Sequence, residues 1–283
     1  MRSARRATTA LVLGSGGARG WAHIGVLKAL REAGFVPDIC VGTSIGSVAA
    51  AVQGSGALDK ALELAENFDW MQATKILLEP SGSKGGLVKG RNVKSLLESL
   101  IPARDISELS SRFAAVATDL VDGSEKVFTE GPLIEALRAS ISIPGFFTPA
   151  KIGGRHFVDG GIVNPLPILT ARAMGAEFII AVNINNRNAC APPADAAPAR
   201  GAAKLADRLF GGETNPEKMT LLDVFAHSLR VAEDRMTLDC VKASPPDILI
   251  EPPVGGIATL DFTRAREAVK AGFDSAMAAL ANA

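Results

Sequence analysis

The sequence predicts a three-layer α/β/α fold with a mostly parallel central sheet. Short apolar runs of buried-strand length alternate with segments of helical periodicity on both sides of residue 44. The apolar run 39–41 also ends in Gly42-Thr43-Ser44-Ile45-Gly46, and a helical stretch of small residues follows it. That strand–turn–helix context is typical of a nucleophile elbow, a tight turn that presents a reactive serine. Because no linker separates two self-sufficient halves, we expect one domain over residues 1–283.

The amino-acid composition excludes several classes of function. The chain is 47% hydrophobic and 21% charged, and its 30 basic and 30 acidic residues cancel, so no global field favours nucleic acid as a partner. Its three cysteines, Cys40, Cys190 and Cys240, are an odd number without C-x-x-C spacing, which predicts neither a disulfide frame nor a metal site. Apolar runs are too short for a signal peptide or a membrane-spanning helix. We expect a cytoplasmic protein, with peripheral membrane contact left open.

The first half of the chain begins with a buried strand at 10–13, a glycine-rich loop and a helix at 21–33. A second strand then leads into the elbow. Later helices are expected at 58–70 and 93–101. Between them, residues 71–90 combine apolar side chains with a loop rich in Gly, Ser and Lys. This segment is either a mobile lid over a binding site or an ordinary surface connection.

The second half continues the alternation of strands and helices. The expected elements are strands 113–120 and 125–129, a helix 132–140, a hairpin 151–158, a helix 167–174 and a strand 178–184. Residues 189–203 are rich in Ala and Pro and are expected to form a flexible surface loop. The region 219–281 is expected to hold a helix at 221–241, a strand at 248–251 and a helix at 263–281.

The glycine-rich loop 14–20 has two interpretations. Glycines at 14, 16 and 20 between a strand and a helix could form a dinucleotide-binding turn. That site needs an acidic residue at the end of the second strand, whereas Asp38 stands at its start. In the alternative, Gly16, Gly17 and their neighbours present backbone N–H groups to a developing oxyanion, next to the serine elbow. The sequence favours the second interpretation.

A serine nucleophile needs a base. The three histidines, His23, His156 and His227, are each expected to be structural from their positions in helices and a strand. Asp159 follows an apolar strand and precedes two glycines. In a desolvated pocket its basicity would rise enough to accept a proton from Ser44.

These motifs in this order resemble the patatin-like phospholipase family. The residues that carry the resemblance are Gly14-Ser15-Gly16-Gly17-Ala18-Arg19-Gly20, then Gly42-Thr43-Ser44-Ile45-Gly46, then Asp159-Gly160-Gly161. The run Ala22-His23-Ile24-Gly25-Val26-Leu27 is similar to the bacterial and neuropathy-target-esterase-like branch. The resemblance spans about residues 10–185 and includes Ser140 to Pro144, which match a Ser-x-x-x-Pro segment of the family. One departure is Ser15, which replaces a glycine of the first motif.

The resemblance implies a Ser44–Asp159 dyad that works without histidine. It also implies an oxyanion hole at Gly16, Gly17 and Ala18, with Arg19 in the same motif, and no cofactor or metal. The predicted function is a serine esterase that hydrolyses fatty-acyl esters of phospholipids or lysophospholipids in lipid catabolism. The alternative is a non-catalytic protein that binds lipid or a protein partner through the same pocket.

Overall fold

The computed structural model describes residues 6–77, 79, 86, 88–186 and 221–282. The predicted surface loop 189–203 lies outside these residues, as does most of the loop that precedes residue 88. The helices (α), 3-10 turns (η) and strands (β), in chain order, are β1 (Thr9–Leu13), η1 (Gly17–Gly20), α1 (Trp21–Glu32), β2 (Ile39–Thr43), α2 (Ile45–Gly54), α3 (Leu58–Asn67), α4 (Trp70–Leu77), α5 (Arg91–Leu100), η2 (Ile106–Glu108), β3 (Arg112–Asp119), β4 (Glu125–Phe128), α6 (Leu133–Ser140), β5 (Ala150–Ile152), β6 (Arg155–Asp159), η3 (Gly160–Ile162), α7 (Ile168–Ala173), β7 (Phe178–Val182), α9 (Leu221–Ala243), β8 (Ile248–Ile250), η5 (Phe262–Arg264) and α10 (Ala265–Ala281).

The strands form one sheet in the order β5-β6-β3-β2-β1-β7-β8, and β4 pairs with β3. The five strands from β3 to β8 in this order run parallel, whereas β4, β5 and β6 add antiparallel pairs at one side. In the centre, Leu13 at the end of β1 is in register with Gly42 of β2 and with Val182 of β7. The predicted mostly parallel sheet is confirmed.

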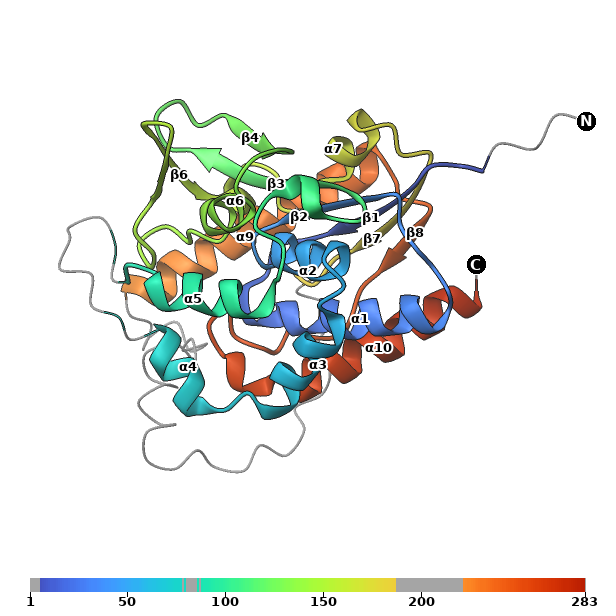
Figure 1. The fold of residues 1–283 in the computed structure, drawn as a ribbon, viewed down its shortest axis with the longest axis horizontal. Helices are drawn as coiled ribbons and strands as arrows, with labels where there is room; N and C mark the ends of the chain where they lie inside the picture. The colour runs from blue at the N-terminus through green and yellow to red at the C-terminus, as the bar shows by residue number, and fades with distance from the viewer. Residues whose placement is uncertain (1–5, 78, 80–85, 87, 187–220, 283) are drawn as a thin grey trace, which may run out of the picture.

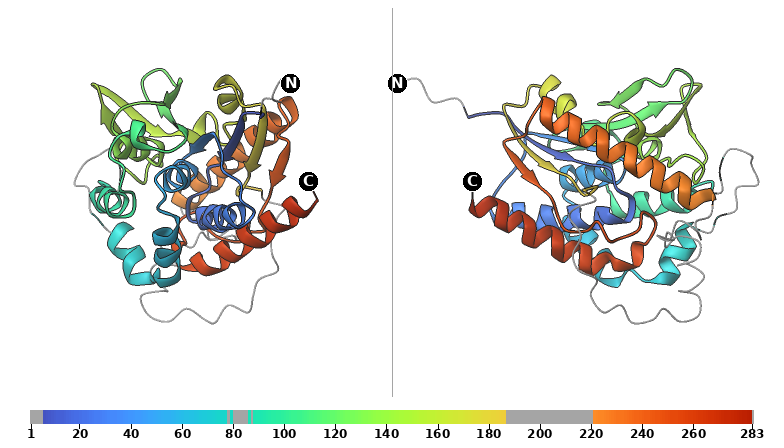
Figure 2. Two further views of the ribbon diagram at one scale, coloured as in Figure 1. Left: turned by 45° about the vertical axis from the view of Figure 1, so that its right-hand side comes forward. Right: turned by 180° about the vertical axis from the view of Figure 1, so that it is seen from behind.

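Helices cover both faces of the sheet, and the alternation along β1 shows why. Ala10 and Val12 join an apolar cluster with α7 and the end of α9, while Leu11 and Leu13 face a larger cluster with α1, α2 and α10. Successive side chains of a strand point to opposite faces, so a strand buried on both faces is apolar throughout. α9 lies behind the sheet in Figure 1 and comes forward when the molecule is seen from behind in Figure 2, whereas α1, α2 and α10 pack on the opposite face. The predicted three layers are therefore present.

One predicted helix is wrong in its extent. The pattern predicted a single helix over 58–70, but α3 ends at Asn67 and α4 begins at Trp70. Between them Phe68 adopts an extended backbone and packs its ring 5.3 Å from Trp21 and 6.3 Å from Phe262. Burial of this aromatic side chain outweighs one more turn of helix. The question whether 71–90 acts as a lid stays open, and most of its loop lies outside the described residues.

Helices α1 and α10 pack against each other with a glycine of each helix at the contact. A methyl group on Gly25 of α1 would lie 1.9 Å from the carbonyl oxygen of Val269. A methyl group on Gly272 of α10 would lie 1.9 Å from the carbonyl oxygen of Ala22. Both distances are far below van der Waals contact, so only glycine fits at either position. The two helices lie side by side in Figure 1.

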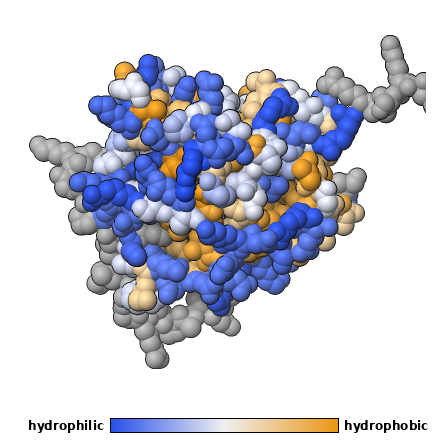
Figure 3. All heavy atoms as spheres, in the orientation of Figure 1, coloured by the Kyte–Doolittle hydropathy of each residue, from blue (hydrophilic) through white to orange (hydrophobic). Residues whose placement is uncertain are grey.

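Hydrophilic residues cover much of the face shown in Figure 3, with apolar residues visible between them. Some large apolar side chains are exposed, among them Trp70 and Met71 at the start of α4 and Phe225 in α9. Within the described part of the chain, no helix combines the length and the apolar character that a bilayer crossing requires.

Candidate active site

Ser44 sits in a strained turn between β2 and α2. Its φ of 55° makes it the one non-glycine residue with positive φ in the described part of the chain. The flanking glycines are sterically required: a methyl group on Gly42 would lie 2.3 Å from the backbone of Gly46, and one on Gly46 would lie 2.1 Å from the carbonyl oxygen of Leu13. Such strain in a non-glycine residue is found where the surrounding structure holds a side chain for a function.

The hydroxyl of Ser44 donates a hydrogen bond to Asp159. Its Oγ lies 2.5 Å from Oδ2 of the carboxylate, and both side chains are buried. The backbone N–H of Ser44 donates to Oγ of Ser140 at 2.9 Å, and that hydroxyl in turn donates to the carbonyl of Val116 at 2.5 Å. The structure thus brings together two residues that are 115 positions apart in sequence and fixes the backbone of one of them.

Asp159 lies at the end of β6, where two glycines follow it. Its Oδ1 accepts a hydrogen bond from the N–H of Gly161 at 2.8 Å. Burial raises the pKa of Asp159 from 3.8 to about 7, and the neighbouring charge of Glu233 adds to the increase, whereas the donors Ser44 and Gly161 oppose it. A carboxylate of this pKa accepts a proton far more readily than one in water.

The glycine-rich loop lies beside the elbow, and its backbone is held from two sides. A methyl group on Gly46 would lie 2.7 Å from the carbonyl oxygen of Gly14. Gly17 has a φ of 58° and lies so close to Thr259 that a methyl group there would be 2.2 Å from its carbonyl oxygen. That oxygen accepts the N–H of Ala18 at 2.8 Å. Among the described residues, none accepts a hydrogen bond from the N–H of Gly16 or of Gly17.

Arg19 is buried beneath this loop. Its guanidinium donates to Oδ1 of Asn185 at 2.6 Å and to the carbonyl of Ile257 at 3.1 Å. Burial lowers the pKa of Arg19 to about 9, and the positive charge of Arg230 acts in the same direction, whereas Glu233 opposes the decrease. Arg19 therefore joins the loop to the strand end after β7 and to the segment before α10.

The three histidines lie in different places, and none of the hydrogen bonds described for Ser44 or Asp159 involves a histidine. His23 is fully buried, with Nε2 2.9 Å from the carbonyl oxygen of Gly14. Burial lowers its pKa to about 4, so its imidazole is neutral at physiological pH. His156 is exposed on β6, and His227 is half-buried on α9.

The cysteines that the structure describes are both free thiols. Cys40 is buried in β2, and Cys240 is half-buried near the end of α9. Cys190 lies outside the described residues. In the described part of the chain, no group of three or more His, Cys, Asp or Glu side chains is placed to hold a metal ion.

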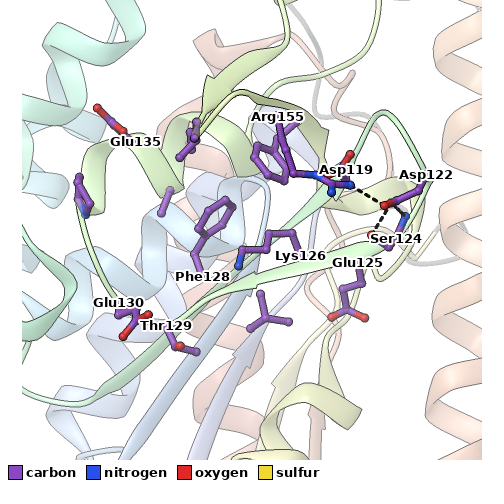
Figure 4. Close-up of a pocket in the computed structure, with 16 residues that line it drawn as sticks. Asp119, Asp122, Ser124, Glu125, Lys126, Phe128, Thr129, Glu130, Glu135 and Arg155 are labelled. Atoms are coloured by element: carbon purple, nitrogen blue, oxygen red, sulfur yellow. Dashed lines mark hydrogen bonds and ion pairs between the residues drawn. The ribbon is translucent and has the colours of Figure 1, made fainter.

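A cavity of about 540 Å³ lies between β4, α6 and the β5–β6 hairpin. Figure 4 shows Arg155 paired with Asp119 and Asp122 at one end of it. Neither Ser44 nor Asp159 is among its lining residues. Its many acidic side chains make it unsuitable for a fatty-acyl chain, because charged groups are costly to cover with hydrocarbon.

Sequence reasoning missed three residues around the predicted site, namely Glu233, Asn185 and Thr259. Each lies beyond the motifs, and each contacts the glycine-rich loop or the residues that hold it. The one available indication was polar spacing in the helix 221–241, where Arg230, Glu233 and Thr237 recur every three or four residues. That pattern also fits an ordinary solvated helix face.

Known proteins match this chain over the region that holds these motifs. A model of the family described as patatin-like phospholipase matches residues 11–172. An uncharacterized NTE family protein of Mycobacterium tuberculosis is 31% identical to this chain, in an alignment that covers 96% of this chain and 91% of that protein. Patatin-like phospholipase domain-containing protein 6 of Homo sapiens is 30% identical over 277 residues, which cover 94% of this chain and 20% of that protein. Among solved structures, VipD from Legionella pneumophila covers 99% of this chain and 68% of its own, with 14% identity and a TM-score of 0.49.

The match of the family model covers more than half of the chain and includes the glycine-rich loop, the elbow and Asp159. The relatives extend the similarity over nearly the whole chain. This chain therefore belongs to the patatin-like phospholipase family.

Proposed function

We propose that the protein hydrolyses carboxylic esters of fatty acids through a Ser44–Asp159 dyad. The observation that carries the proposal is the hydrogen bond of 2.5 Å between the Ser44 hydroxyl and the buried Asp159 carboxylate. It joins a nucleophile in a strained turn to a base with a raised pKa. These are the two groups that acyl transfer through a covalent intermediate requires.

In the proposed reaction, Asp159 accepts the Ser44 proton as Oγ attacks the ester carbonyl carbon. The negative charge that develops on the carbonyl oxygen is stabilised by the loop of Gly16, Gly17, Ala18 and Arg19. Within this loop the N–H groups of Gly16 and Gly17 are the donors, because that of Ala18 already bonds to Thr259. The tetrahedral intermediate expels the alcohol, which takes the proton from Asp159. Asp159 then removes a proton from the water that attacks the acyl-enzyme, and it passes this proton to Oγ of Ser44 as the fatty acid leaves, which restores both side chains.

The proposed substrates are phospholipids or lysophospholipids, and the proposed role is their catabolism. Family membership supports this class of substrate. Such substrates reside in or near membranes, and the exposed side chains of Trp70, Met71 and Phe225 offer apolar area for peripheral contact with a lipid surface. We expect Trp70→Ser to weaken co-sedimentation with phosphatidylcholine vesicles, while hydrolysis of a water-soluble ester is unchanged.

The test of the dyad compares purified variants on a short-chain p-nitrophenyl ester. Ser44→Ala and Asp159→Asn should each lower kcat by about a thousandfold or more, the scale of single catalytic-residue losses. His156→Gln and His227→Gln should leave kcat within about tenfold of the wild type. A histidine variant as inactive as Ser44→Ala would contradict the dyad.

A fluorophosphonate probe tests the nucleophile separately. We expect it to label Ser44 in the wild type and in the histidine variants, but not in Ser44→Ala. A folded wild-type protein that is not labelled, and that hydrolyses no ester, would indicate instead a protein that binds lipid or a partner without catalysis.

A further inference from the structure

A second carboxylate, that of Glu233 on α9, lies next to the dyad. Its side chain is almost completely buried. A methyl group on Gly161 would lie 2.4 Å from Oε1 of Glu233 and 3.2 Å from Oδ1 of Asp159. The two carboxylates therefore face each other across Gly161, whose N–H donates to Asp159 alone. The absence of a side chain at residue 161 is what allows this approach.

The other oxygen of Glu233 faces the glycine-rich loop. Its Oε2 accepts hydrogen bonds from Oγ of Ser15 at 3.2 Å and from Nδ2 of Asn185 at 2.6 Å. Asn185 in turn accepts a hydrogen bond from the buried Arg19. Ser15 has no positive φ, so a serine is tolerated where the family motif has a glycine. The hydroxyl group that this serine adds donates the hydrogen bond to Glu233.

We propose that Glu233 is a positioning residue of the hydrolase, which holds the oxyanion loop through Ser15 and presents a negative charge to Asp159. The inference rests on the proposed function, because it assigns Glu233 a part in the proton transfer between Ser44 and Asp159. The hydrogen bonds described for the Glu233 side chain go to Ser15 and Asn185 and not to Ser44.

The charged groups around the pair determine which carboxylate stays ionised. Glu233 has two donors on Oε2 and the positive charges of Arg19 and Arg230 nearby, all of which favour its ionised form, although burial raises its pKa. Asp159 has the Ser44 hydroxyl and one N–H, and it faces the charge of Glu233. When the two carboxylates hold one proton between them, that proton is therefore on Asp159 and Glu233 stays ionised. When Ser44 gives up its proton, the repulsion between the two carboxylates is relieved, which makes Asp159 a stronger base.

The experiment is the pH profile of kcat/KM for a p-nitrophenyl ester. Glu233→Gln removes the charge and keeps the shape, so the acid limb of the profile should shift to lower pH by about one unit or more. On the plateau kcat should fall by about tenfold, because Asp159 becomes a weaker base, while KM changes by less than about threefold. The control is Asp239→Asn, an exposed carboxylate on the same helix, which should leave the profile unmoved.

Ser15→Ala separates the two parts of the role. This variant removes the hydrogen bond between the loop and Glu233 but keeps the charge of Glu233. We therefore expect kcat to fall several-fold while the acid limb of the pH profile stays where it is. An unchanged kcat in this variant would overturn the loop-holding part of the proposal.

Because Glu233→Gln leaves Arg19 without its buried counter-charge, this variant can fail to fold. Glu233→Asp then takes its place, since it retains the charge but withdraws it from Asp159. It should shift the acid limb in the same direction by a smaller amount. If a folded Glu233 variant has the wild-type acid limb and plateau, the positioning role is overturned while the dyad stands. If Ser44→Ala retains wild-type activity, the proposed function itself fails.

Discussion

Replacement of Asp159 by asparagine should make the folded protein more stable at neutral and alkaline pH while it abolishes catalysis. Asp159 is buried, and its pKa rises from 3.8 to about 7 on folding, first through burial and then through the charge of Glu233. Between about pH 4 and pH 7 the folded protein therefore holds a proton that the unfolded chain has already released. By linkage, the free energy of unfolding falls as the pH rises through this window.

The magnitude follows from the size of the shift. A shift of about three units, at 1.36 kcal/mol per unit, corresponds to a stability loss of about 4 kcal/mol above pH 7. Asparagine does not titrate and keeps the oxygen that accepts the N–H of Gly161. The variant should therefore gain up to about 4 kcal/mol relative to the wild type between about pH 4 and pH 8. Titrating groups that do not interact with Asp159, such as His23, are present in both proteins and cancel in the difference.

The assay is urea unfolding, followed by circular dichroism, of both proteins at about pH 5 and pH 8. Asp274→Asn, which changes an exposed carboxylate in α10, is the matched control and should stay within about 1 kcal/mol of the wild type at both pH values. A difference between Asp159→Asn and the wild type that is the same at both pH values would refute the reasoning. It would mean that the Asp159 carboxyl titrates in the folded protein as it does in water.

Three more variants or probes test the packing around the site. Gly272→Ala, which drives a methyl group into the carbonyl of Ala22, should lower the free energy of unfolding by about 2 kcal/mol or more in urea titrations, although the same change in an open helix is stabilising. Ser140→Ala leaves the Ser44 N–H without its partner and should cost about 1–3 kcal/mol in the same titrations, together with a measurable fall in kcat. Burial raises the pKa of the Cys40 thiol to about 11, so iodoacetamide at about pH 8 should alkylate it only after unfolding, as mass spectrometry of its peptide would show.

Much of the fold could be predicted because local pattern and global architecture agree. The central strands β1, β2 and β7 are almost entirely apolar, and the glycines at 42 and 46 indicate the elbow before any contact is known. The break in the helix near Phe68 could not be predicted. It depends on the rings of Trp21 and Phe262, which come together only in the folded chain.

In the candidate site, too, some residues could be predicted from the sequence and others could not. Ser44 and the glycine-rich loop can be recognised from their motifs, and Asp159 from its place after a strand and in the family pattern. Glu233 has no such motif. Its burial results from the way α9 crosses the sheet beside η3, and its partner Ser15 lies 218 positions away. The hydrogen bond from Ala18 to Thr259 likewise depends on a segment that has no regular pattern of its own.

The attachment of the glycine-rich loop to the end of the chain has a consequence for protein synthesis. Gly17 and Ala18 rest against Thr259, and α1 rests against α10 through Gly25 and Gly272. A nascent chain that has released Ser44 and Asp159 from the ribosome still lacks the segment against which Gly17 and Ala18 rest. If Gly16 and Gly17 are the oxyanion donors, as proposed, a translation product interrupted before residue 259 should carry Ser44 and Asp159 without a fixed donor loop, and it should hydrolyse no ester.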